Sequence, residues 1–377
     1  MPSTPHGGKL VQVNQKDLAE SSGRNLSLTV SAESAVTIQN IAQGILSPIE
    51  GFMGRNDYQR VLDEMRLEND IPWTIPILLH APEGLTAGNG DEVDLVNDSG
   101  STVGVLAFEE SYKIDRKEFA KKVFKTEDES HPGVANAYSQ SPWVVGGKIL
   151  WASKPQETEF TPVTLTPKET RFLFKEKAWK NVVAFQTRNA PHIGHEYVQK
   201  TALAFADGIF INPVLGKKKP GDFTDEAIVV AYKTLMKGYY PAGTAVMSIL
   251  NYEMQYAGPR EAILHAIMRK NFGCSHIAIG RDHAGVGKFY EPYEAQEIFE
   301  EFPDLGISPL FFREFFYCTK CLGIANEKIC PHAESDRLTF SGTKLRTMFQ
   351  SGEAPPKEFM RPEVADAIMG LPQPFVE

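Results

Sequence analysis

The chain has 377 residues, 42% hydrophobic and 23% charged, a composition typical of a globular protein long enough for two or three domains. Its longest apolar runs, residues 244–250 and 307–312, are too short to cross a bilayer, and the N-terminus lacks an apolar signal-peptide core, so we expect a cytoplasmic protein with no membrane partner. A net charge of −9 argues against a general nucleic-acid binder, which usually carries a basic surface.

The N-terminal part, residues 1–165, is predicted to be β-rich. Three β-type runs separated by Gly, Asp and Asn turn signals are residues 74–80, 92–96 and 102–108. Helical periodicity appears at residues 35–43 and 58–65. The polar stretch 126–142 is predicted to be a loop, after which residues 143–147 resume strand character.

From about residue 180 the pattern changes to strands that alternate with helices. The predicted strands are 182–185, 208–213, 244–250 and 276–280, and the predicted helices are 195–206, 224–236 and 258–271. This alternation predicts right-handed crossovers and a parallel sheet, with ligands at the carboxyl ends of the strands. Because the polar motifs follow these strand ends, we predict that this α/β region is the catalytic domain.

The first motif is QTRNAPHIGH, residues 186–195, which leaves a buried strand and opens a helix. A helix N-terminus favours a phosphate group, and Gly194 allows close approach to the backbone. His192 and His195, one turn apart, can both donate to the same anion. The alternative, two core or capping histidines beside an ordinary turn, is less favoured because Arg188 and Asn189 occupy the same strand end.

The second motif, GRDHAGVG at residues 280–287, also follows a predicted strand. Its glycines free backbone N–H groups for an anion-binding concavity, and Arg281 supplies a guanidinium suited to an oxyanion. Asp282 and His283 are expected to orient the turn. A glycine-rich loop alone is a weak signal, but its recurrence at the same sheet edge strengthens the interpretation.

Two further segments are candidates for phosphate contacts. SGTKLR at residues 341–346 places hydroxyls and amides before a helix with two cations, although a capped helix with a solvated cationic face has the same pattern. The loop with Lys217, Lys218 and Lys219 between glycines either flanks the phosphates or is a solvated loop. The chain then continues into a helical tail, with Pro362 at an early helical position.

Three of the four cysteines cluster in the C-terminal part. Cys318 and Cys321 have the spacing of a zinc knuckle, and Cys330 and His332 complete a set of four ligands. With four protein ligands no position is left for substrate, so we predict a structural Zn²⁺. The identity of the fourth ligand stays open, since Asp336 or a more distant histidine is an alternative to His332. Cys274 is predicted to be a core residue.

Together these motifs resemble ATP sulfurylase (sulfate adenylyltransferase) over essentially the whole chain. The segments that carry the resemblance, in the family's order, are PHGG at 5–8, SPIEGFM at 47–53, residues 186–195, 280–285 and 341–346, and PEV at 362–364. The resemblance implies an N-terminal PUA-like domain (1–165), a Rossmann-like nucleotidyltransferase domain (166–317) and a small C-terminal region with the zinc knuckle (318–377). It also implies a single-function form without an adenylyl sulfate kinase domain, and we expect a homodimer.

The resemblance also implies the roles of the site residues. Sulfate would be held by Gln186, Arg188, Arg281 and the backbone of Ala284. The catalytic set would be Thr187, Arg188, Asn189, His192 and His195, in which the histidines bind the β- and γ-phosphates. The nucleotide-binding set would be Gln186, Asn189, His192, His195, Gly280, Arg281, Asp282, His283 and Phe315. Ala190 stands where the family often has proline, and the following Pro191 is expected to preserve the turn.

The expected reaction converts ATP and sulfate into adenylyl sulfate (APS) and pyrophosphate. Sulfate is already a dianion and needs no general base, so positioning and electrostatic stabilisation are expected to dominate, with in-line attack on the α-phosphorus and Mg²⁺ entering with ATP. The alternatives are adenylyl transfer to an organic phosphate acceptor and an RNA-binding module. The arginines at the strand ends argue against the first, and the acidic balance argues against the second.

Overall fold

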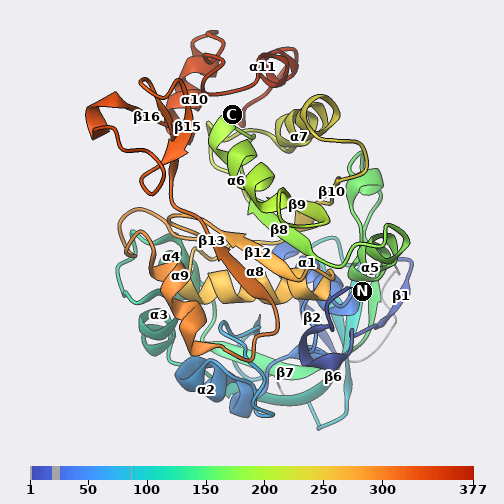
Figure 1. The fold of residues 1–377 in the computed structure, drawn as a ribbon. Helices are drawn as coiled ribbons and strands as arrows, with labels where there is room; N and C mark the ends of the chain where they lie inside the picture. Colours follow the sequence, from blue (N-terminus) through green and yellow to red (C-terminus); the bar gives the residue numbers. More distant parts are fainter. Residues whose placement is uncertain (1, 19–25, 86) are drawn as a thin grey trace. The chain divides into compact units, whose positions relative to one another are not determined.

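The computed structural model describes residues 2–18, 26–85 and 87–377 (Figure 1). The chain divides into two units, each built from several segments of the sequence. The first unit contains Met1–Lys177, Met254–Cys274 and Asp282–Ser308. The second unit contains Ala178–Glu253, Ser275–Arg281 and Pro309–Glu377.

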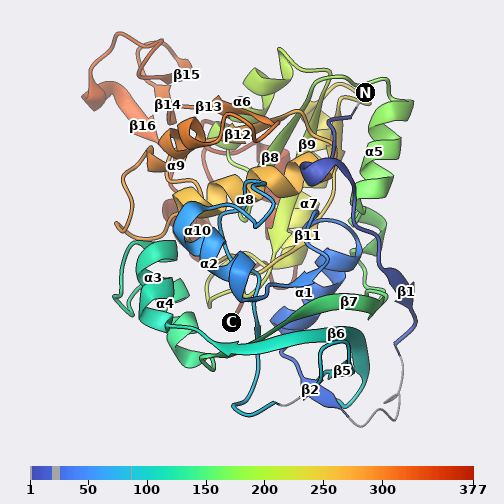
Figure 2. The same cartoon turned by 90° about the horizontal axis from the view of Figure 1, so that it is seen from below.

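A mixed sheet forms the centre of the first unit, with the strand order β1-β7-β6-β5-β2 and with β3 and β4 also paired to β7. Its strands are β1 (Asn14–Lys16), β2 (Ser27–Thr29), β3 (Gly51–Phe52), β4 (Leu79–His80), β5 (Glu92–Val96), β6 (Thr102–Lys113) and β7 (Trp143–Ser153). Figure 2 shows the long antiparallel pair β6–β7 with α1 beside it. A Cβ at Gly51 would lie 1.9 Å from the carbonyl oxygen of Gly147, so the close β3–β7 pairing requires glycine.

Helices surround this sheet in the first unit. They are α1 (Ala32–Ala42), α2 (Arg55–Glu64), α3 (Arg116–Phe124), α4 (Pro132–Ser139), α5 (Pro167–Glu176), α8 (Pro259–Asn271) and α9 (Glu294–Glu297), with 3₁₀ turns at His6–Gly8, Thr161–Val163 and Ile298–Glu301. Helix α8 is buried along nearly its whole length. It buries polar and charged side chains as well as apolar ones: Glu261, His265, Arg269, Lys270 and Asn271.

Two sequence predictions for this unit need correction. The stretch 126–142 is not all loop, because His131 accepts the N–H of Gly133 (3.0 Å) and Pro132 opens α4. The predicted strand 74–80 is confirmed only at Leu79–His80. Trp73 and Thr74 instead use their side chains to bond backbone carbonyls, which anchors an irregular buried segment.

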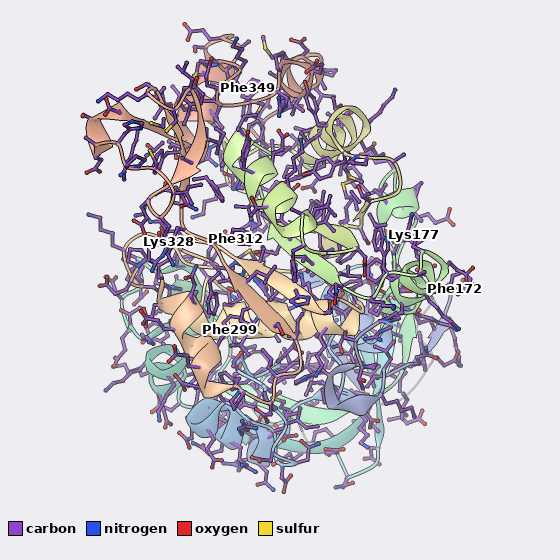
Figure 3. All side chains as sticks on the ribbon, in the orientation of Figure 1. Phe172, Lys177, Phe299, Phe312, Lys328 and Phe349 are labelled. Carbon is purple, nitrogen blue, oxygen red and sulfur yellow. The ribbon has the colours of Figure 1, made fainter. Side chains whose placement is uncertain are left out.

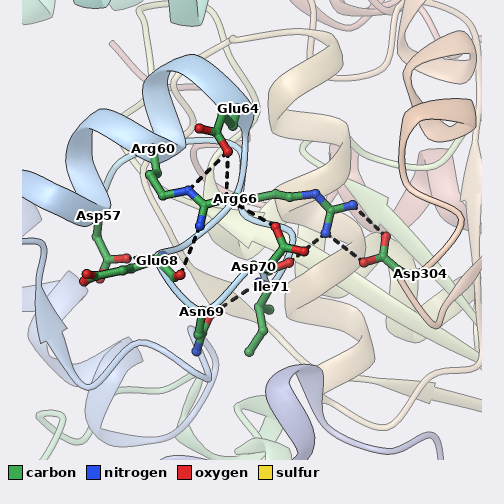
Figure 4. Close-up of polar contacts among 9 residues, drawn as sticks. All are labelled: Asp57, Arg60, Glu64, Arg66, Glu68, Asn69, Asp70, Ile71 and Asp304. Carbon is green, nitrogen blue, oxygen red and sulfur yellow. Dashed lines mark hydrogen bonds and ion pairs between the residues drawn. The ribbon is translucent and has the colours of Figure 1, made fainter.

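Exposed and half-buried ion pairs connect separate segments of the first unit (Figure 4). Arg66 binds Asp304 with both guanidinium nitrogens, at 2.8 and 2.9 Å. Arg60 binds Glu64 at 2.7 Å and Asp70 at 3.3 Å. The bidentate Arg66–Asp304 pair therefore joins the turn after α2 to the segment that follows the 3₁₀ turn Ile298–Glu301.

The second unit is built on the parallel sheet that the alternating pattern predicts. The strand order is β10-β9-β8-β12-β13, with β11 also on β9; the strands are β8 (Val182–Thr187), β9 (Gly208–Leu215), β10 (Ala245–Met247), β11 (Leu250–Asn251), β12 (His276–Ile279) and β13 (Ser308–Phe311). Pairs β8–β9, β8–β12 and β9–β10 are parallel. The predicted strand 244–250 is found as two short pieces, β10 and β11, which pair with β9 in the same register, and Ser248 between them donates its N–H to the carbonyl of Ile211 at 3.0 Å.

Helices α6 (Ile193–Leu203), α7 (Asp225–Tyr239), α10 (Gly342–Gln350) and α11 (Pro362–Met369) belong to the same unit. The predicted start of the last helix at Pro362 is confirmed. A small antiparallel sheet of β14 (Phe315–Cys318), β15 (Gly323–Asn326) and β16 (Arg337–Thr339) has the order β15-β14-β16. Among the described residues no helix has the length and apolar character that a membrane span requires.

A buried charge cluster attaches the C-terminal segment to α6. Glu196, only 1% exposed, accepts hydrogen bonds from Arg361 Nε and Nη2, both at 2.8 Å, and from Lys200 Nζ at 2.6 Å. The Arg361 guanidinium also lies 4.3 Å from the ring centroid of Tyr239. Burial opposes ionisation of Glu196, but the hydrogen bonds from Arg361 and Lys200 outweigh it and lower the pKa of this carboxyl.

We predict that Arg361→Ala lowers the free energy of unfolding by about 2 kcal/mol or more, because it leaves the buried Glu196 carboxylate with Lys200 alone. The lowered pKa makes this contribution fully present at neutral pH and lost as the pH falls below about 4. Urea denaturation of both proteins at neutral and acidic pH measures this. An equal difference between variant and wild type at both pH values contradicts the assignment.

Candidate active site and metal centre

Two histidine rings are stacked where β8 leads into α6. His192 is the N-cap of α6, and its Nδ1 accepts the backbone N–H of His195 at 3.2 Å. The two ring centroids lie 3.7 Å apart with an interplanar angle of 17°. Phe185 of β8 contacts the His195 ring edge-on at 5.7 Å. The structure thus brings together the two histidines that the motif predicts to act on one anion.

The helix N-terminus itself has less anion-binding capacity than the sequence suggests. Ile193 N–H donates to the carbonyl of Phe359 at 2.8 Å, and His195 N–H donates to His192 Nδ1. These amides are therefore already satisfied. Since His192 Nδ1 is an acceptor, the neutral ring carries its proton on Nε2. The Nε2–H of His192, rather than the amides of Ile193 and His195, is the donor that this turn offers to a phosphate.

Burial keeps both imidazoles neutral. Desolvation lowers the pKa of His195 to about 4, a weaker contact with the Ala190 backbone acting in the opposite direction. Desolvation, with a smaller repulsion from His195, holds the pKa of His192 well below its usual range. At neutral pH these groups are therefore neutral imidazoles and not fixed cations.

Phe340, which no motif indicated, completes the histidine stack. Its ring lies 5.3 Å from that of His192 with an interplanar angle of 18°. A Cβ at Gly194 would come within 2.7 Å of Phe340 and 3.0 Å of His192, so glycine is required for the ring to approach α6. Sequence reasoning began the third motif at Ser341 and so missed its neighbour, although an aromatic residue beside a phosphate motif is a usable signal.

The ends of β8 and β12 bring two arginines to the same edge of the sheet. Val183 pairs with His276 and Ala184 with Ile277 in a parallel ladder, so Arg188 and Arg281, which follow the ends of the two strands, lie at the same edge of the sheet. Arg188 Nη2 donates to the carbonyl of Lys217 at 3.0 Å. The predicted neighbours Gln186, Thr187 and Asn189 occupy the end of β8 and the turn after it, where Asn189 N–H donates to Thr187 Oγ1 at 3.3 Å.

Arg281 has an acidic partner that the sequence did not reveal. Its Nη1 lies 2.7 Å from Glu314 Oε2, and both side chains are partly exposed. Glu314 stands in the segment between β13 and β14, next to the predicted adenine-contacting residue Phe315. Phe315 is buried, and its ring lies 6.3 Å from that of Tyr197 on α6.

The second half of the glycine-rich loop belongs to the first unit and is held by α8. Asp282 and Ala284 both have left-handed backbone conformations, with φ of 52° and 56°. The carbonyl of Ala284 accepts the N–H of Gly258 at 3.0 Å, and His283 Nε2 lies 3.1 Å from Nδ1 of the buried His265. The Gly280 end of the motif lies in the second unit.

A pocket of about 120 Å³ adjoins this half of the loop in the first unit. Its lining comes from the loop, from the start of α8 and from the following segment: Gly258, Pro259, Asp282, His283, Gly285, Val286, Gly287, Tyr290, Glu291 and Ala295. Desolvation, followed by repulsion from His265 and Arg269, holds the pKa of His283 well below its usual range. His283 is therefore a neutral side chain that fixes the loop.

The lysine loop and the 341–346 segment lie together. Arg346 Nη1 binds Asp222 at 3.1 Å. Ser341 caps α10 by accepting the N–H of Lys344 at 3.3 Å. Lys218 is turned to the carbonyl of Phe223 and to Asp225, both within 3 Å, and so has a structural role in this state.

The three clustered cysteines and His332 converge. Their ligand atoms lie within 4.8 Å of one another: Cys321 Sγ to Cys330 Sγ is 3.8 Å, and His332 Nδ1 is 3.3, 3.2 and 3.7 Å from Sγ of Cys318, Cys321 and Cys330. Tetrahedral zinc with Zn–S near 2.3 Å places sulfurs about 3.8 Å apart, so the set fits a zinc-sized ion. His332, rather than Asp336, completes the set.

The Cys318 thiol also has electrostatics suited to a metal ligand. Although desolvation opposes ionisation, hydrogen bonds from the backbone of Cys321 and Lys320 lower the pKa of Cys318 to about 6. A thiolate is the form that binds a metal. Cys274 is buried and lies outside this group, as predicted, and desolvation raises its pKa.

Comparison with known proteins identifies the family of the chain. A family model for ATP-sulfurylase matches residues 161–370, and one for a PUA-like domain matches residues 3–154. Sulfate adenylyltransferases from Hyperthermus butylicus and Thermococcus onnurineus are 54% and 53% identical, over 100% of this chain and 98% and 100% of theirs. The chain belongs to the ATP-sulfurylase family.

A solved structure of a hexameric APS kinase from Thiobacillus denitrificans is also similar, with a TM-score of 0.76 and 21% sequence identity. The similarity covers 98% of this chain and 68% of that one, and at this identity it concerns the fold alone. The predicted fold class is confirmed: a PUA-like N-terminal part with a mixed sheet, a parallel α/β catalytic sheet and a small C-terminal cysteine cluster.

We predict that the imidazoles of His192 and His195 stay neutral and do not titrate between about pH 5.5 and 8, because burial lowers their pKa values below the ordinary value near 6.5. NMR of ¹⁵N-labelled imidazoles measures this, with His192→Asn and His195→Asn assigning the signals. In the unfolded protein the same signals should titrate near pH 6.5, so folding stability falls on acidification through this range. A transition near pH 6.5 in the folded protein contradicts the prediction.

Proposed function

We propose that the chain transfers the adenylyl group of ATP to sulfate, giving APS and pyrophosphate, at the strand ends of the second unit and with the glycine-rich loop. Its membership of the ATP-sulfurylase family supports the reaction class. The observation that carries the assignment of the site is the pairing of β8 with β12. The end of β8 is followed by Arg188 and the two neutral histidines. The end of β12, beside it in the sheet, is followed by a second arginine, Arg281.

The two ends of the first motif, residues 186–195, bind different ligands. His192 and His195 bind the β- and γ-phosphates of ATP and stabilise the departing pyrophosphate, His192 through its Nε2–H. Magnesium, which enters bound to ATP, supplies further neutralisation of the phosphate charge. Because these donors are held in place before the reaction, they need little reorganisation when negative charge develops on the leaving group.

Sulfate is placed by the cationic strand ends. Gln186, Arg188 and Arg281 hold the dianion, with the backbone N–H of Ala284 as a further donor. Glu314, which binds Arg281 at 2.7 Å, keeps the guanidinium neutralised until the oxyanion replaces it. Sulfate then attacks the α-phosphorus in line, and no covalent enzyme intermediate is needed. Thr187 and Asn189 orient the nucleotide through the turn that they brace.

The remaining properties that we propose are those that resemblance to the ATP-sulfurylase family implies. Gly280, Asp282, His283 and Phe315 contribute to nucleotide binding, His283 as a group that fixes the loop and Phe315 through its backbone. The domains are residues 1–165, 166–317 and 318–377. The protein functions in the cytoplasm as a homodimer, without nucleic-acid or membrane partners. The Cys318, Cys321, Cys330 and His332 cluster holds a structural zinc ion.

His195→Ala is expected to lower the rate of sulfate-dependent pyrophosphate release by about 10²–10³-fold, because it removes a preorganised donor to the leaving group. A coupled pyrophosphate assay with ATP, Mg²⁺ and sulfate measures this, and thermal unfolding reports whether the fold is retained. Near-wild-type pyrophosphate release by a folded His195→Ala protein would contradict the site assignment.

The acceptor is tested with the wild-type enzyme. Molybdate in place of sulfate should release pyrophosphate without a stable adenylyl product, as expected for a site built for a small tetrahedral oxyanion. An organic phosphate that supports pyrophosphate release better than sulfate would favour the alternative acceptor class. A salt-sensitive gel shift with unstructured RNA would favour the RNA-binding alternative, and none is expected.

We predict about one zinc ion per chain by metal analysis, lost in Cys321→Ser but retained in Cys274→Ala, whose thiol lies outside the cluster. Strong chelators should lower the melting temperature of the wild-type protein, because metal binding contributes to folding. A purified protein without zinc whose melting temperature is indifferent to chelators contradicts the proposed metal site.

A further inference from the structure

Phe340 lies between the histidine stack and the cysteine cluster, which the sequence presents as separate sites. It follows β16 directly, and its ring stacks on His192 at 5.3 Å. His192 in turn stacks on His195 at 3.7 Å. The edge of a third aromatic ring, Phe359, contacts Phe340 at 5.6 Å with an interplanar angle of 81°. Phe340 thus extends the histidine stack and is itself supported from the side.

The backbone of α6 is shaped to accept this ring. The Cβ that any other residue would place at position 194 meets Phe340 at 2.7 Å. Phe359, which braces the ring, also accepts the N–H of Ile193 through its carbonyl at 2.8 Å. The contact between Phe340 and the start of α6 therefore involves the backbone of the phosphate-binding turn as well as its side chains.

The other end of the segment is tied to the cysteine cluster. Strand β16 pairs antiparallel with β14, and Cys318 lies opposite Arg337. Arg337 Nη2 donates to the carbonyl of His332 at 3.0 Å, and its guanidinium lies 4.6 Å from the ring centroid of Phe316. Thr319 N–H donates to the carbonyl of Asp336 at 2.9 Å. The path of the chain into Phe340 is thus fixed by contacts with or beside two of the four metal-binding residues, Cys318 and His332.

We infer that Phe340 is a positioning residue for His192 and His195, and that the metal-bound cluster acts on ATP and pyrophosphate binding through it. This inference rests on the proposed role of the two histidines. His192 is oriented by one hydrogen bond and by its ring contacts, so loss of the Phe340 ring widens the range of orientations of its Nε2–H. Loss of the metal frees β16 and has the same consequence at the histidines.

The first test compares two phenylalanines of the same region. Phe340→Leu should weaken pyrophosphate binding and raise KM for ATP by roughly three- to tenfold, the equivalent of one aromatic contact, while KM for sulfate stays unchanged. Phe340→Tyr, which keeps the ring, should restore wild-type values. Phe349→Leu is the matched control, because Phe349 (labelled in Figure 3) contacts the rings of Phe223 and Phe375 and should affect melting temperature only.

The second test asks whether the metal acts through Phe340. Cys321→Ser should lose zinc and weaken pyrophosphate binding, measured by calorimetry, by a factor similar to that of Phe340→Leu. The double variant should be no weaker than the stronger single variant, because both changes remove the same constraint. Independent effects would multiply instead. Zinc content is measured on each protein, so that Phe340→Leu is known to keep its metal.

The outcomes separate this inference from the proposed function. Unchanged pyrophosphate binding in folded Phe340→Leu, or multiplicative effects in the double variant, overturns the coupling even if His195→Ala is inactive. Active His195→Ala overturns the proposed site itself. Equal losses in Phe340→Leu and Phe349→Leu show a general packing effect and also overturn the positioning role.

Discussion

The desolvation of the half-buried His192 and His195 side chains is the constraint on which the rest of the site depends. An anion site built from buried cations carries a large desolvation cost whenever it is empty. Here desolvation keeps both imidazoles neutral, so the site is stable without ligand and still offers N–H donors. Neutral donors also bind the product pyrophosphate less tightly than fixed cations do. This suits a reaction in which a highly charged product has to leave.

The proposed acceptor side of the site, with Arg188 and Arg281, has the opposite arrangement. Arg188 and Arg281 carry permanent charge and remain partly exposed, and Arg281 is balanced by Glu314. Exposed cations can hold a small dianion without a large desolvation cost, and a carboxylate partner prevents strong binding of the wrong anion. The two halves of the motif that follows β8 therefore differ in protonation chemistry as well as in ligand. One half supplies neutral donors, and the other supplies charge.

Sequence reasoning succeeded where local signals and topology agree. The strand–helix alternation predicts the parallel sheet, and motifs that follow strands must meet at one edge, as β8 and β12 do. It failed where distant segments decide the outcome. Glu314 acts through a contact with Arg281, 33 residues away, and Phe340 through a ring contact with His192, far along the chain. Backbone amides at the start of α6 looked available, but the Phe359 carbonyl, far along the chain, occupies one of them.

The small C-terminal sheet shows why a metal and a catalytic contact belong together. Its buried core cluster consists of Phe316, Cys318, Ala325 and Cys330, so two of its four members are thiols. So little apolar area cannot hold three short strands in register by hydrophobic burial alone. Coordination of the proposed metal ion by Cys318, Cys321, Cys330 and His332 is the interaction strong enough to do so. Since β16 is one of these strands and leads directly into Phe340, whatever stabilises the small sheet also determines how firmly the histidine stack is held.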